Sequence, residues 1–215
     1  MNEFEVLMEK ILSHFAGEGF KDELTRAKRQ YFESTVPNEE NPELFDQRMS
    51  QFFDWYFFTR ELDGYGQTPL EVCESIRELR FSMTEKNLIQ QMRQHRHSLF
   101  QFIKLKGEDV YLKDLFANEK VIVKKSKQIF GFDPEEFFEA RLIPTGDNYV
   151  FTRGFCFHPS SAQKFILSEI KRHKKDPDLN PEGFMLRLVK MRYKFEQYKH
   201  VKPEMIYTTN AKVGV

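Results

Sequence analysis

Apolar residues recur at the spacing of an amphipathic helix through the first 97 residues. In the first such stretch one face holds Phe4, Leu7, Met8, Ile11, Leu12 and Phe15. Asn2 can cap this helix, and Thr68-Pro69-Leu70-Glu71 has the capping-box pattern that starts another. The pattern predicts five helices: one that ends at Gly17, and four at about residues 20–33, 42–61, 69–80 and 85–96.

The third predicted helix carries the densest aromatic cluster of the chain, Phe52-Phe53-Asp54-Trp55-Tyr56-Phe57-Phe58. A helix that is apolar on most sides is usually buried on most sides, so we expect this one to be central. Asp54 lies inside the cluster, and we expect it to point outward or to cap a neighbouring segment. A buried acid is the alternative, and it would need a partner that the local sequence does not supply.

Residues 98–157 change to short β-rich runs separated by turn residues. The runs are rich in β-branched and aromatic residues and stand at 99–105, 110–112, 121–123, 137–143 and 149–152. Thr145-Gly146-Asp147-Asn148 has the chemistry of a hairpin turn. Because the connections are short, the strands should pair antiparallel, and we predict about five of them in a small sheet or a partly closed barrel.

Helical spacing returns after the sheet. His158-Pro159-Ser160-Ser161 starts a sixth helix, and a seventh runs from about Pro181 to Lys199. The sequence therefore predicts an α+β fold in one compact unit. Its parts are a helical region at 1–97, a β-sheet or barrel region at 98–157, C-terminal helices at 158–204 and a tail at 205–215.

The composition indicates an aromatic-rich core and a segregated charge. Of 215 residues, 40% are hydrophobic and 23 are Phe, and a Phe-lined ligand cavity is the alternative to a plain core. Basic and acidic residues are equal at 33 each, yet residues 1–92 carry 10 basic and 18 acidic side chains, and residues 93–215 carry 23 and 15. The two halves can attract each other within a molecule or a dimer, or the basic half can face an anionic partner.

Cys73 and Cys156 are the two cysteines, and they form no metal-spaced pair. Acidic residues interrupt the apolar positions of the first 20 residues, unlike a signal peptide, and no apolar run approaches the roughly 20 residues of a membrane span. We therefore expect a cytoplasmic protein whose cysteines are reduced and buried.

Three pieces of sequence occur together over roughly residues 45–165. They are Phe53–Phe57 followed by Gly66–Glu71, Ser98–Phe100 with Val110–Leu115, and Ala140–Pro144. The set resembles an uncharacterised bacterial domain that often accompanies a short cysteine-rich SEC-C metal-binding motif. The resemblance implies a structural likeness. Because this chain lacks a cysteine-rich zinc motif, the resemblance carries over neither a zinc-dependent role nor catalytic residues.

Motifs of known chemistry are sparse. The chain has no phosphate-binding glycine loop, no GxSxG and no HExxH, so we predict neither catalytic residues nor a cofactor, and an enzyme is the less favoured class. His95 and His97 are two residues apart, as are Cys156 and His158 at the far end of the sheet region. These four side chains would make a zinc site if they met, although pairs at this spacing also arise by chance.

Arg93 and Arg96 join His95 and His97 in a cationic group at the predicted helix–sheet junction. Cyclic-dinucleotide receptors of the PilZ type place an arginine motif in a similar position, which makes this junction a candidate anion or nucleotide site. The second half of that signature is missing here. A solvated helix end, whose cations face the C-terminal dipole, is the alternative.

The C-terminal helices form the last candidate surface, because residues 164–215 contain 12 Lys or Arg against 6 Asp or Glu. The candidate contacts to nucleic acid or a partner are Lys171, Arg172, Lys174, Lys175, Arg187, Lys190, Arg192 and Lys194. The leading prediction is a non-enzymatic cytoplasmic binding or adaptor protein with a protein partner or self-association. Nucleic-acid binding by these helices is the alternative, and nucleotide or metal binding at the junction ranks below it.

Overall fold

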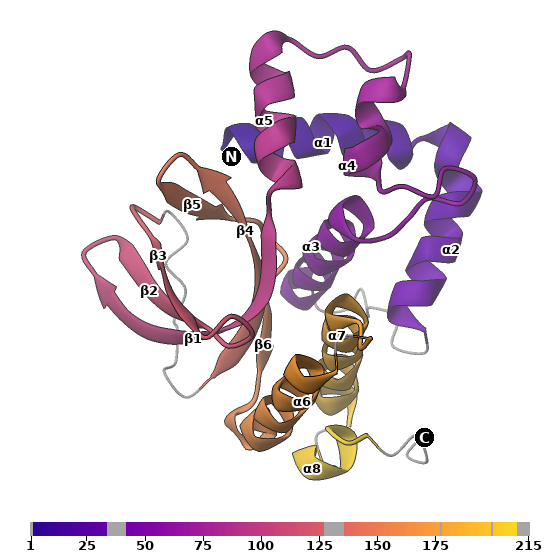
Figure 1. The fold of residues 1–215 in the computed structure, drawn as a ribbon. Helices are drawn as coiled ribbons and strands as arrows, with labels where there is room; N and C mark the ends of the chain where they lie inside the picture. Colours follow the sequence, from indigo (N-terminus) through magenta and orange to yellow (C-terminus); the bar gives the residue numbers. More distant parts are fainter. Residues whose placement is uncertain (1, 34–41, 127–135, 177, 199, 210–215) are drawn as a thin grey trace. The chain divides into compact units, whose positions relative to one another are not determined.

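A computed structural model describes residues 2–33, 42–126, 136–176, 178–198 and 200–209. The loop expected near Gly131–Pro134 and the last residues of the expected tail lie outside this part of the chain. The fold is α+β, as the sequence predicts: a curled antiparallel sheet with helices before and after it (Figure 1). None of the described helices is both long and apolar enough to cross a membrane.

Six of the seven predicted helices are confirmed with small shifts of their ends. The α-helices are α1 (Glu3–Phe15), α2 (Lys21–Phe32), α3 (Pro42–Phe58), α4 (Pro69–Val72), α5 (Met83–Arg93), α6 (Gln163–Lys175), α7 (Pro181–Gln197) and α8 (Pro203–Ile206). Asn2, Thr68 and Ser82 form capping boxes with Glu5, Glu71 and Glu85. Three short 3₁₀ segments, Glu18–Phe20, Cys73–Ser75 and Ser160–Ala162, join some of the helices.

The prediction of a helix from Pro69 to about Arg80 is wrong, since helical structure there ends at Ser75. The Sγ of Cys73 donates to the carbonyl of Leu70, and the Oγ of Ser75 donates to the carbonyl of Val72. Such side-chain bonds compete with helix propagation, and Ile76 adopts an extended conformation. Another difference lies in the predicted tail, where α8 forms and Tyr207 is buried.

The sheet contains the five predicted strands and one more. The strands are β1 (Arg96–Lys106), β2 (Asp109–Asp114), β3 (Glu119–Val123), β4 (Phe137–Thr145), β5 (Asn148–Phe151) and β6 (Cys156–His158). Their order is β3-β2-β1-β4-β5, and β6 pairs with the first residues of β4. The β4–β5 hairpin turns at Gly146, whose φ of 65° explains the glycine in the predicted turn.

The chain divides into two units, each made of two stretches. The first unit comprises residues 1–96 and 141–154, and the second comprises residues 97–140 and 155–215. The first unit carries 14 basic and 19 acidic residues, and the second carries 19 and 14. The charge asymmetry of the sequence therefore separates by structural unit. That the whole chain forms one compact unit stays a prediction.

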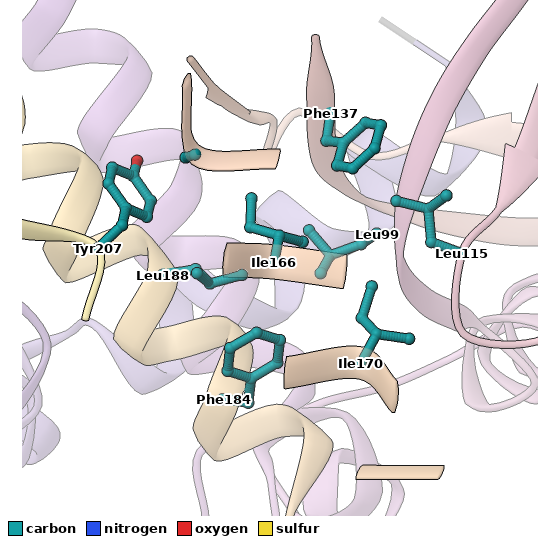
Figure 2. Close-up of a cluster of buried hydrophobic side chains, with 9 residues drawn as sticks. Leu99, Leu115, Phe137, Ile166, Ile170, Phe184, Leu188 and Tyr207 are labelled. Carbon is teal, nitrogen blue, oxygen red and sulfur yellow. The ribbon is translucent and has the colours of Figure 1, made fainter. Parts of the chain in front are cut away.

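Each unit has an aromatic-rich core. In the first unit, Phe52, Tyr56 and Phe57 of α3 are fully buried, which confirms that this helix is buried on most sides. In the second unit, residues of the sheet, α6, α7 and the C-terminal segment pack together, as Figure 2 shows. That cluster consists of Leu99, Leu115, Phe137, Ala162, Ile166, Ile170, Phe184, Leu188 and Tyr207.

Candidate functional site

The first unit contains a cavity of about 630 Å³. Its walls come from α1, α3 and the β4–β5 hairpin, together with Met92 of α5. Ligand pockets in proteins span about 300–1,000 Å³ and are mostly apolar with a few polar groups. This cavity has that size and that kind of lining, and we therefore take it as the candidate functional site.

The sequence of α1 explains the first wall. Its apolar stripe is wider than the core needs: Phe4, Leu7, Ile11 and Phe15 are buried, and Met8 and Leu12, on the flank of the stripe, are only half-buried. Met8 and Leu12 line the cavity. Half-buried apolar side chains on a cavity wall leave apolar surface for a ligand to cover.

Helix α3 forms the second wall with Met49, Phe53 and Asp54. The expectation that Asp54 points outward is wrong, because only 5% of its surface is exposed. Its partner is Arg141 of β4, which is fully buried and whose Nε donates to Asp54 Oδ2 at 2.9 Å. Arg141 also donates from Nη2 to Thr59 Oγ1 at 2.9 Å, and its guanidinium lies 4.7 Å from the centre of the Phe58 ring.

A glycine makes room for the Asp54 carboxylate. A Cβ on Gly154 would lie 2.6 Å from Asp54 Cβ and 2.8 Å from Asp54 Cγ, much closer than non-bonded carbons approach. Any larger residue would therefore push Asp54 away from Arg141. The Oδ1 atom of Asp54 is buried and has no hydrogen-bond partner among the described residues.

The charges around the cavity are mostly acidic. Glu5 is paired with Arg153 through two hydrogen bonds of 3.1 Å, and Asp54 is paired with Arg141. Glu9 and Asp46 also line the cavity and are exposed, and neither forms an ion pair with any described residue. The unpaired charges of the described lining are therefore both negative.

The structure gives the three candidate histidines other partners. His95 lies in the first unit, where its Nδ1 contacts the carbonyl of Met92 at 2.9 Å. Cys156 and His158 are buried in β6, and His158 Nδ1 lies 3.2 Å from the hydroxyl of Tyr207. Burial lowers the pKa of His158 to about 3, so the ring is neutral at pH 7. The described residues contain no group of three or more His, Cys, Asp or Glu arranged to hold a metal ion.

His97 of the second unit lies between two carboxylates. Its Nε2 is 3.0 Å from Glu139 Oε1 on β4, and its Nδ1 is 2.7 Å from Glu182 Oε2 at the start of α7. Ionised carboxylates only accept hydrogen bonds, so both contacts form when both ring nitrogens carry a proton. This bridge joins β1 to β4 and α7. Its three residues are far apart in the sequence, so no local sequence pattern predicts the bridge.

Arg93 and Arg96, the two arginines of the predicted junction, lie at the end of α5 and the start of β1. Arg93 Nη1 pairs with Glu74 at 2.8 Å, and Arg93 Nη2 donates to the carbonyl of Glu71 at 3.0 Å. Arg93 thereby ties the end of α5 to the α4 segment. Arg96 begins β1 and is half-buried. Their role as an anion site stays a prediction.

The candidate basic residues of the C-terminal helices divide into two groups. Lys171, Arg172, Lys174 and Lys175 are exposed in the last turns of α6, although Lys174 donates to the carbonyl of Leu115 and Arg172 pairs with Glu169. On α7, Arg187 is exposed, whereas Lys190, Arg192 and Lys194 are half-buried. Arg192 pairs with Glu196 of the same helix at 2.9 Å.

Comparison with known proteins places the chain in a family. The model of a family of unknown function (DUF7986) matches residues 7–183, which include residues 7–96 and 141–154 of the first unit. The chain belongs to this family. Neither the curated proteins nor the solved structures that were compared contain a match to it. The family therefore contributes no activity, and the site must be interpreted from its own chemistry.

Two sequence signals could have revealed the buried ion pair beside the cavity. Arg141 is the one cation in the apolar run at 137–143, and Asp54 is the one acid among the aromatic residues of α3. A lone charge inside a buried element needs a partner, so these two could have been matched. The cavity itself had no such signal, because it depends on how α1, α3 and the β4–β5 hairpin pack.

Proposed function

We propose that this protein binds a small, mostly apolar molecule in the cavity of the first unit. The cavity carries the proposal: it has the volume of a ligand pocket and half-buried apolar walls at Met8, Leu12, Met49 and Phe53.

The charges select the head group of the ligand. The carboxylates of Glu9 and Asp46 line the cavity without an ion-pair partner among the described residues. An anionic ligand such as a fatty acid would meet like charge there, and a cationic amine would meet opposite charge. The ligand we propose is therefore an apolar body with a primary amine or a similar cationic end.

Paired ligands test both parts of the proposal. Octylamine and octanoate share an apolar chain and differ in charge, and their binding to the purified protein can be measured by isothermal titration calorimetry. Leu12→Trp fills the cavity from α1, and Val6→Trp places the same side chain on the same helix at a position 55% exposed and outside the lining. A third variant, Glu9→Gln with Asp46→Asn, removes the unpaired charges.

We expect octylamine to bind, octanoate to bind at least tenfold more weakly, and the paired charge variant to reduce this preference. Leu12→Trp should abolish octylamine binding, and Val6→Trp should retain it. If octylamine does not bind, or binds equally well to Leu12→Trp, the cavity is not the site. If octanoate binds as well as octylamine, the apolar part of the proposal stands and the amine is wrong.

Several finer predictions from the sequence stand beside the ligand-binding proposal. An adaptor role with a protein partner or self-association, a cytoplasmic location, and kinship to domains that accompany a SEC-C motif all stay predictions. Nucleic-acid binding by the C-terminal helices is the second candidate function, supported by the exposed cations at the end of α6. Size-exclusion chromatography with light scattering tests self-association directly.

A further inference from the structure

The geometry points to a second binding surface, unrelated to the cavity: we propose that the outer face of the β1–β2–β3 meander binds single-stranded nucleic acid. The register defines this face. Val110 and Leu112 of β2 and Val121 and Val123 of β3 are buried, so the alternate residues point outward. The outward residues of the three strands include Lys104, Lys106, Tyr111, Lys113, Lys120 and Ile122.

The lysines of this face form no ion pairs within the described part of the chain. Neither Lys104, Lys106, Lys113 nor Lys120 forms an ion pair with a described residue, and Asp109, opposite Lys106, is the one acid at the paired outward positions of β2. Lys113 and Lys120 are directly opposite each other on β2 and β3. Like charges at directly opposite positions destabilise a sheet. An anionic ligand would relieve this repulsion.

Tyr111 supplies an aromatic surface at the centre of the same face. It lies on β2, the middle strand, between Lys104 of β1 and Ile122 of β3. The ammonium of Lys104 lies 5.0 Å from the centre of the Tyr111 ring. Because Lys104 is exposed, this ring face is on the outer side of the sheet. Ile122, 38% exposed, extends the apolar surface beside it.

This combination selects the kind of anion. Lysines that contact phosphates around an aromatic ring on which a base stacks are the arrangement of sequence-tolerant single-strand binding. A duplex keeps its bases stacked on each other and cannot offer one to Tyr111. Single-stranded DNA and RNA share the required chemistry, and parallel measurements distinguish them.

Fluorescence anisotropy with the full chain tests the proposal. The probes are labelled oligothymidylate and oligouridylate of about 12 nucleotides, within the usual site sizes, and a DNA duplex of the same length. Three sets of variants are compared. The first is Lys104→Gln/Lys113→Gln/Lys120→Gln on the sheet, and the second is Tyr111→Ala and Tyr111→Phe. The third, Lys171→Gln/Arg172→Gln/Lys175→Gln, tests the rival surface on α6. All the substituted cations are at the surface, so the fold should survive, and circular dichroism confirms it.

We expect single strands to bind more tightly than the duplex, with affinity falling as salt rises from about 50 to about 200 mM. The sheet variant should weaken binding at least tenfold and reduce the slope of log affinity against log salt by about 2, since each phosphate contact contributes about 0.7. Tyr111→Ala should weaken binding about 5- to 150-fold, the range for one stacked base, and Tyr111→Phe should retain it. The α6 variant should bind normally, because this proposal places the site on the sheet and not on the C-terminal helices.

Three results would overturn the proposal. No binding of either single strand at about 50 mM salt would exclude a nucleic-acid surface on this chain. Loss of binding in the α6 variant, with normal binding by the sheet variant, would move the site to the C-terminal helices. Binding that Tyr111→Ala leaves unchanged, or equally tight binding of the duplex, would show attraction to phosphate without a stacked base.

Discussion

The buried pair of Asp54 and Arg141 gives the sharpest prediction about stability. Arg141 is fully buried, so Asp54→Asn leaves its guanidinium without the opposite charge that compensates for its desolvation. Removing one member of a buried ion pair typically costs about 3–5 kcal/mol of unfolding free energy. In a chain of this size each kcal/mol lowers the melting temperature by about 2–4 °C, so a decrease of roughly 6–20 °C is expected.

A double-mutant cycle isolates the pair. The cycle compares Asp54→Asn, Arg141→Met and the double variant by unfolding in urea, which does not screen ion pairs. Unfolding is followed by the fluorescence of Trp55, the single Trp, which is next to Asp54 on α3. Because both partners are removed together, the double variant should cost about 2–3 kcal/mol less than the sum of the single variants. Arg153→Met with Glu5→Gln is the control, since Arg153 is 52% exposed and such a pair should couple by less than about 1 kcal/mol.

Two results would refute this reasoning. One is a cost for Asp54→Asn no greater than that for Glu5→Gln, which would mean that Arg141 finds enough compensation from Thr59 and the ring of Phe58. The other is strict additivity in the cycle, which would mean that the two side chains do not interact in solution.

Three further predictions concern other parts of the chain. Gly154→Ala should destabilise the protein by about 1–3 kcal/mol in urea unfolding, because the new methyl group would overlap Asp54; Gly19→Ala, with open space around it, should not show this overlap cost. Burial lowers the pKa of His158 to about 3, so between about pH 6.5 and pH 3 the unfolded chain binds more protons than the folded chain. The unfolding free energy should therefore fall by up to about 1.4 kcal/mol per pH unit as pH decreases through this range. His158→Gln should remove that part of the pH dependence, and equal slopes in variant and parent would contradict it. Leu188→Ala, in the cluster of Figure 2, should cost about 2–5 kcal/mol, whereas exposed Leu167→Ala should change the midpoint little.

Most of the fold was accessible from local sequence patterns. Helical spacing located the long helices, and the cap residues Asn2 and Thr68 indicated where α1 and α4 start, because a cap depends on residues within one turn. The Gly146 turn fixed the β4–β5 hairpin for the same reason. The pattern failed where side chains of the α4 segment bond to their own backbone, and it missed β6, a three-residue strand with too little sequence to show a period.

The sequence by itself determined the α+β class, the central aromatic helix and the segregation of charge, since each follows from residue types and their spacing along the chain. Only the tertiary structure decided which charges meet. Asp54 and Arg141 are 87 residues apart, and His97 and Glu182 are 85 apart, so no local period relates them. The cavity likewise exists only where α1, α3 and the β4–β5 hairpin pack with space between them. Pairing and empty volume are properties of packing, which brings distant residues together, and a linear pattern does not contain them.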